Sequence, residues 1–98
     1  MLHMVINTHG ADTCAFRSDE NREPMVSAFR ALSAAATSSG GKLESAWVNL
    51  SAHTAFLLID APSGHVVDEI VREAGLIGHT TTNIFPVNVL TEALEQVT

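Results

Sequence analysis

The segment from His53 to Asp60 constrains the fold more than any other, because it is almost continuously apolar. It consists of His-Thr-Ala-Phe-Leu-Leu-Ile-Asp, and the turn-forming sequence Ala-Pro-Ser-Gly follows it at residues 61–64. A short apolar run that ends in this way is typical of a central strand covered on both faces. We therefore expect a sheet that has this segment in its interior.

Residues 2–8 form a second predicted strand, because apolar and mixed positions alternate along them. We expect the more apolar face to lie beneath helices, and this face consists of Leu2, Met4 and Ile6. The mixed face suits a subunit contact or a cavity wall, and it consists of His3, Val5 and Asn7. Residues 43–50 and 81–89 complete the predicted strands, and Pro86 places the last of them at a sheet edge or a bulge.

Two helices are predicted between these strands. The first is expected to begin at the polar segment 17–21, which carries N-cap candidates and acidic groups suited to the positive end of a helix dipole, with Pro24 in its first turn. It runs to about Ala36, and the glycines of Ser-Ser-Gly-Gly at 38–41 end it. Its apolar stripe consists of Met25, Ala28, Phe29, Leu32, Ala35 and Ala36. The second begins after Ser63 as N-cap and ends at Gly75. Its inward side chains are Val66, Val67, Ile70, Val71 and Ala74. A short helix is expected over 91–96.

The order β-α-β-β-α-β predicts an α+β fold of the ferredoxin-like type, as a single domain over residues 1–98. A crossover connection makes the first two strands parallel, with room for one strand between them. The third strand fills that gap and the fourth pairs on the other side of the first. The prediction is a four-stranded antiparallel sheet with two helices on one face.

Composition restricts the partners and the location of the chain. Charged residues make up only 16% of the sequence while apolar residues make up 46%, so we expect an apolar face that a second subunit covers in a homodimer. A net charge of −6 with five basic residues argues against nucleic-acid binding. No apolar run is long enough to span a membrane, no export signal is recognisable, and a single cysteine excludes an internal disulfide. These features favour a cytoplasmic protein.

The predicted topology brings His9, Cys14 and His53 to one edge of the sheet. Two imidazoles and a thiolate are suitable ligands for Zn, Cu, Ni or Fe, and three protein ligands leave one position open. The same residues also permit a thiolate activated by imidazolium, or incidental solvated histidines beside a small buried cysteine. His79 and Asn49 are expected at this edge. The remaining histidines are expected at the opposite edge, as surface residues; they are His3 and His65.

The chain resembles small uncharacterised bacterial domains of the dimeric α+β barrel superfamily. The resemblance rests on Thr8-His9 followed by Cys14, a Thr-His-x4-Cys opening, and on the later segments His53–Phe56 and Ile84–Val87. It implies a ferredoxin-like fold whose sheets pack face to face in a homodimer, with a cavity between sheet and helices. The wider superfamily includes cofactor-free monooxygenases, isomerases, haem-degrading enzymes and proteins with no assigned activity, so the fold alone does not select a function.

Three functions follow as hypotheses. The first is binding of a transition metal or a small ligand through His9, Cys14 and His53. The second is a cofactor-independent monooxygenase- or isomerase-like enzyme with a histidine base in an apolar cavity. That enzyme requires a cavity bordered by Phe29, Trp47 and Phe56. The third is a non-catalytic interaction module in which the histidines are incidental.

Overall fold

The computed structural model describes residues 1–12, 14, 19–76, 78 and 80–98. Its strands are β1 (Leu2–Thr8), β2 (Lys42–Asn49), β3 (Thr54–Asp60) and β4 (Thr81–Val87). Its helices are α1 (Asp19–Ser38), α2 (Gly64–Ala74) and α3 (Leu90–Glu95). The predicted order β-α-β-β-α-β is confirmed, and so is the short helix that follows it.

The sheet has the predicted strand order, β2-β3-β1-β4, and every neighbouring pair is antiparallel. The register pairs Thr8 at the end of β1 with Thr54 at the start of β3 and with Thr81 at the start of β4. Asn49 at the end of β2 also pairs with Thr54. The ends of β1 and β2 and the beginnings of β3 and β4 therefore share one edge of the sheet, as the topology predicted.

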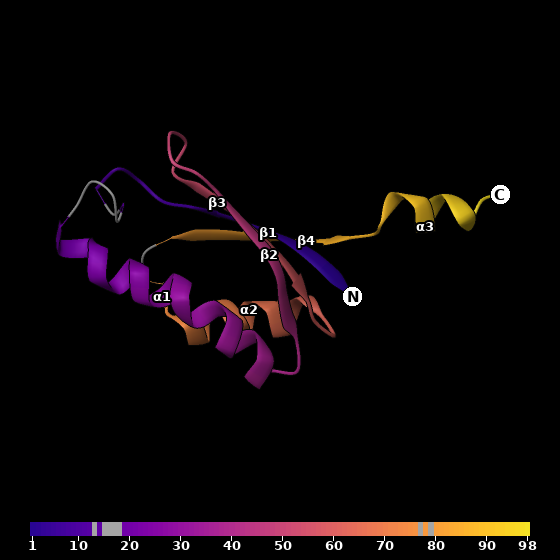
Figure 1. Cartoon of the computed structure of the whole chain (residues 1–98), viewed down its shortest axis with the longest axis horizontal. Coiled ribbons are helices and arrows are strands. Elements are labelled where there is room, and N and C mark those ends of the chain that lie inside the picture. Colours follow the sequence, from indigo (N-terminus) through magenta and orange to yellow (C-terminus); the bar gives the residue numbers. More distant parts are fainter. Residues whose placement is uncertain (13, 15–18, 77, 79) are drawn as a thin grey trace.

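Helices α1 and α2 lie together on one side of the sheet (Figure 1). The expectation for β1 is wrong, because the mixed face lies beneath these helices and is fully buried. Val5 pairs with Leu57 on β3 and with Ile84 on β4. The side of the sheet that the helices cover is therefore apolar because of residues on the neighbouring strands. The alternation within a single strand does not contain that information. Among the described residues, no helix covers the more apolar face of β1.

Helix α1 begins at Asp19, within the segment 17–21 where its N-terminus was expected, but Pro24 lies beyond the first turn in which it was expected. Pro24 therefore lies inside the helix, where it cannot donate to the carbonyl of Glu20. Two acidic side chains near the positive end of the helix dipole, Asp19 and Glu20, favour the additional turn. Arg22 also forms an ion pair with Asp19 at 3.0 Å. The apolar stripe is confirmed, with Met25, Ala28, Leu32, Ala35 and Ala36 buried.

Most of the remaining predicted boundaries of helices and strands are confirmed. Ser63 Oγ accepts a hydrogen bond from the Val66 amide at 3.3 Å, and Gly75 closes α2 with φ of 97°. Gly40 ends α1 with φ of 82°, a left-handed conformation that glycine adopts without strain. Strand β4 is two residues shorter than predicted, and α3 begins at Leu90 after Val89 rather than at a Thr91 cap. Pro86 lies in an edge strand, as predicted.

Helix α3 extends away from the rest of the molecule at the end of the segment that follows β4 (Figure 1). None of its residues is buried, and its exposed apolar side chains include Leu90 and Leu94. Among the described residues, no helix has both the length and the apolar composition that crossing a membrane requires.

Candidate metal centre

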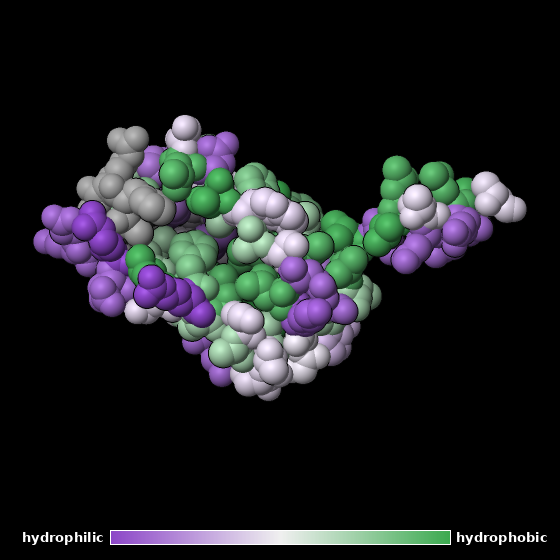
Figure 2. All heavy atoms as spheres, in the orientation of Figure 1, coloured by the Kyte–Doolittle hydropathy of each residue, from purple (hydrophilic) through white to green (hydrophobic). Residues whose placement is uncertain are grey.

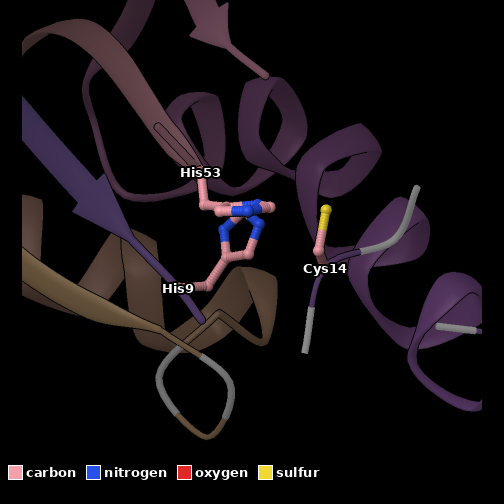
Figure 3. Close-up of side chains that lie close together, drawn as sticks. All are labelled: His9, Cys14 and His53. Carbon is pink, nitrogen blue, oxygen red and sulfur yellow. The ribbon is translucent and has the colours of Figure 1, made fainter. Parts of the chain in front are cut away.

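His9 and His53 are neighbours because β1 pairs with β3. His9 directly follows β1, His53 directly precedes β3, and the His9 amide donates a hydrogen bond to the His53 carbonyl at 3.1 Å. The two imidazole rings meet edge to face, with centroids 5.3 Å apart and an angle of 65° between their planes (Figure 3). The predicted convergence of these two histidines is therefore confirmed.

The loop that presents His53 is a tight connection between β2 and β3. The Asn49 side-chain oxygen accepts from the Ala52 amide at 3.1 Å, and the Thr54 hydroxyl donates to the Ala52 carbonyl at 2.9 Å. His53 has φ of 50°, in the left-handed region that glycine and asparagine favour. A histidine held in this conformation is a local strain that the loop imposes at the candidate site. Asn49 lies at the predicted edge and serves the loop through its side chain.

Cys14 completes the group from the segment after β1. Its side chain is only 3% exposed, and it is the single cysteine of the chain. One ligand atom from each of Cys14, His9 and His53 lies within 4.8 Å of the other two. Figure 3 shows the thiol on one side and the two imidazoles on the other, turned toward a common space. Among the described residues, this is the group of three that a metal ion would suit.

Three of the four ring nitrogens of His9 and His53 are buried without a hydrogen-bond partner among the described residues. Both nitrogens of His9 and Nδ1 of His53 are buried and unpaired in the described part of the chain. A buried polar atom without a partner costs about 1–3 kcal/mol, so three in one place require an explanation. A cation that binds the lone pair of one nitrogen from each ring provides one for a nitrogen of His9 and for Nδ1 of His53. His3 Nδ1 and Asn7 Oδ1 are also buried and unpaired, but these residues do not belong to a group of three donors.

The electrostatics of the group favour the ligand form of histidine. Burial lowers the pKa of His9, and the neighbouring His53 lowers that pKa further because two imidazolium charges would repel each other. His9 is therefore more readily neutral than a free histidine, and neutral imidazole is the form that binds metals. Ligand atoms around a tetrahedral ion lie about 3.3–3.8 Å apart. The ligand atoms of this group, which lie within 4.8 Å of one another, are therefore at most about an ångström farther apart than the upper end of that range. Their chemistry fits a metal.

The remaining histidines have different positions from this group. His65 is exposed on α2, as predicted, whereas His3 is 1% exposed on the face beneath the helices. The surface assignment of His3 is therefore wrong, for the same reason as the assignment of the β1 faces. His79 lies outside the described residues.

Asn7, also fully buried, donates through Nδ2 to the hydroxyls of Thr80 and Thr82 at 2.7 and 3.0 Å.

An apolar pocket of about 440 Å³ opens between α1 and β2, and His9 forms part of its wall. Phe29 and Trp47 border this pocket, as the enzyme hypothesis required. Phe56 does not line it, since Phe56 alternates to the opposite face of β3 from Leu57, which does. Two polar residues of the pocket, Arg22 and Arg30, were not predicted from the sequence. Arg22, Val26 and Arg30 follow one another at intervals of four residues, which places them along one side of a helix. This spacing was the feature of the sequence that could have identified the two arginines.

Comparison with known proteins adds information on the fold. No family model matches the chain, and no curated protein matches it. Among solved structures, the chain is similar to the SCO4226 protein of Streptomyces coelicolor A3(2), with a TM-score of 0.56 and 18% sequence identity. The match covers 89% of this chain and 96% of that one. At this identity the likeness concerns the fold, and it supports the ferredoxin-like α+β architecture.

Proposed function

We propose that the protein binds a transition-metal ion through His9, Cys14 and His53. The observation that carries the proposal is the meeting of two imidazoles and a thiol whose ligand atoms lie within 4.8 Å of one another, with three ring nitrogens that are buried and have no partner in the described part of the chain. The ion would bind one nitrogen of each imidazole and take the thiolate as its anionic ligand. Incidental histidines would instead be expected to bind water or to face solvent.

The donor set restricts the metals. Two nitrogens and one thiolate suit Zn²⁺, Cu, Ni²⁺ or Fe²⁺, whereas Mg²⁺ and Ca²⁺ require oxygen ligands. Three protein ligands leave a coordination position for water or a small ligand, unlike a closed structural site with four. The site is accordingly expected to exchange a small ligand at that position.

Metal content of the untagged protein tests the proposal. After removal of bound metal with EDTA, titration with Zn²⁺, Ni²⁺, Cu²⁺ or Fe²⁺ is expected to load about one ion per chain with at least one of these metals. His9→Gln, Cys14→Ser and His53→Asn should each weaken binding by more than the roughly 10–100-fold that loss of a residue supporting a ligand costs. With Co²⁺ as a probe, the thiolate-to-metal charge-transfer band should disappear in Cys14→Ser alone of the three.

His65→Gln is the matched control, because it removes an exposed imidazole outside the group. It should bind metal as the wild type does. Binding that is equally weak in all four variants and the wild type, or that His65→Gln alone reduces, would contradict the proposal.

We further propose that the protein is a homodimer formed through the uncovered face of the sheet. This face lies opposite α1 and α2, and its side chains include Met4 on β1, Leu58 on β3 and Phe85 on β4. Phe85 is 49% exposed, and Trp47 on the edge strand is 54% exposed. A sheet requires a second layer on any apolar face, and the second copy of a small domain supplies that layer most simply.

The enzyme hypothesis remains a second candidate because one imidazole borders an apolar pocket. His9 lines that pocket, and its lowered pKa keeps it available as a base near neutral pH. In a screen of phenols with dioxygen and of unsaturated lactones, such an enzyme would lose activity in His9→Gln and retain it in Cys14→Ser. A metal-dependent reaction would require both residues.

A further inference from the structure

The pocket between α1 and β2 has the form of a binding site for a small organic molecule. Its volume, about 440 Å³, is within the range of known ligand sites, which is roughly 300–1,000 Å³. Apolar side chains form its walls: Val26 and Phe29 from α1, Ala46 and Val48 from β2. Figure 2 shows hydrophobic side chains gathered around the hollow between α1 and the β2–β3 hairpin.

The charges at this pocket have one sign. Both charged side chains among the described residues that line it are arginines, Arg22 and Arg30, although the chain as a whole carries a charge of −6. Arg22 forms an exposed ion pair with Asp19, whereas Arg30 is exposed and has no ion pair with the residues that the structure describes. Two of the five basic residues of an acidic protein therefore border one apolar pocket.

We propose that this pocket binds a small amphipathic carboxylic acid. The apolar body of the acid packs against Phe29 and Val26. Its carboxylate lies at the exposed guanidinium of Arg30, whose planar group can donate two parallel hydrogen bonds to a carboxylate. The pocket excludes organic cations, because it offers them an arginine and no carboxylate among its described lining residues. This inference goes beyond metal binding and does not depend on it, so it can be tested in metal-free protein.

Position links the pocket to the candidate metal centre. His9 lines the pocket and is also one of the three donors of the centre, so one side chain separates the two sites. A bound acid lies against the histidine that holds the ion. Because both ligands would contact His9, binding of the acid is expected to change the affinity for the metal, and binding of the metal to change the affinity for the acid by the same factor.

Three phenylalkyl compounds of matched size test the proposal: phenylbutyrate, phenylbutanol and phenylbutylamine. Isothermal titration calorimetry measures occupancy of the pocket, because Trp47, although it borders the pocket, pairs with Phe56 and therefore faces the other side of the sheet. In EDTA-treated protein, phenylbutyrate should produce a saturable heat change. Phenylbutanol should bind roughly tenfold more weakly, because it lacks the charge, and phenylbutylamine more weakly still.

Variants separate the charge from the cavity. Arg30→Gln should reduce phenylbutyrate affinity to that of phenylbutanol and leave phenylbutanol binding unchanged. Arg72→Gln, which removes the same charge from α2 outside the pocket, should change neither. Ala46→Phe fills the cavity from β2 and should abolish binding of all three compounds. Val26→Phe fills it from α1 and serves in the same test if the strand variant fails to fold.

The proposal is overturned if wild-type protein binds the acid, the alcohol and the amine equally, or if Ala46→Phe and Val26→Phe both leave phenylbutyrate binding intact. It is also overturned if phenylbutyrate fails to bind and Ala46→Phe converts a dimer to a monomer, because a second copy would then occupy the pocket. If the wild-type protein binds phenylbutyrate but no metal, the proposed metal centre is contradicted and the proposed acid-binding pocket is not.

Discussion

Each of the three candidate ligands comes from a different segment, and strand pairing brings the two histidines together. The sequence predicted this meeting because the topology fixes which strand ends are neighbours, and the pairing of Thr8 with Thr54 follows from it. The sequence did not predict the left-handed backbone of His53 or the burial of His3. Both depend on contacts in three dimensions, namely a loop closure and the packing of helices on one particular face.

The backbone of His53 makes a prediction about stability without metal. A left-handed conformation costs an L-residue with a side chain roughly 1–2 kcal/mol, and glycine avoids that cost. In metal-free protein, His53→Gly is therefore expected to be about 1 kcal/mol more stable than His53→Ala in urea unfolding. Ala52→Gly is the control, since Ala52 has no positive φ and glycine there should not stabilise. Equal stability of the two His53 variants would indicate that the loop is not strained at this residue.

The lowered pKa of His9 predicts how stability depends on pH in metal-free protein. The folded state holds this proton less tightly than the unfolded chain, whose histidine pKa is about 6.5. Stability from this group is therefore complete above about pH 6.5 and declines as the pH falls through the lower pKa of the folded state. His9→Gln should have a flatter dependence of urea midpoint on pH, and His53→Asn should flatten it in part by removing the repulsion. A wild-type protein that becomes more stable over that acidic range would contradict the assignment.

At the scale of elements, periodicity and cap residues predicted where most helices and strands lie. Ser63 and Gly75 bound α2 as expected, because side-chain capping and left-handed glycine are local properties. For α1, the expected start was confirmed, and only the placement of Pro24 in the first turn was wrong. A proline in the second turn is tolerated when the turn before it is stabilised, here by acidic residues at the dipole and the ion pair of Arg22 with Asp19.

Replacement of Pro24 distinguishes the two possible starts of α1. Pro24 is exposed, so Pro24→Ala changes no core packing and restores an amide donor for the Glu20 carbonyl. With α1 beginning at Asp19, Pro24→Ala should raise the free energy of unfolding by about 1–2 kcal/mol, less than the full cost of an interior proline because the unfolded chain gains entropy. Ser27→Ala, an exposed change on the same helix, should contribute only about 0.5 kcal/mol. A loss of stability in Pro24→Ala would place the helix start at the proline itself.

At the scale of the whole molecule, the low charge content predicted a leftover apolar surface, and the structure has one. The sequence misidentified which face of β1 the helices cover, and the consequence is that Leu2, Met4 and Ile6 line the uncovered side. Both faces of β3 are apolar, since Ala55, Leu57 and Ile59 are buried under helices while Phe56 and Leu58 face the other way. A strand that is apolar on both faces in a chain with helices on one face supports the proposed homodimer, in which the second copy would supply the other layer.

A charge placed in the middle of the uncovered face should therefore dissociate the proposed dimer. Leu58 pairs with Met4 on β1 and lies on β3, which is an interior strand, so Leu58→Lys introduces an ammonium at the centre of the contact. Burial of an unpaired charge there costs several kcal/mol, which exceeds what a small interface can retain. Analytical ultracentrifugation should show a dimer for the wild type and a monomer for Leu58→Lys. Ser33→Lys adds the same charge on the exposed side of α1 and should remain dimeric. Because the histidines and the cysteine lie at the sheet edge beside the helices, monomeric Leu58→Lys should still bind metal, whereas joint loss of dimer and metal would mean that the second copy completes the site.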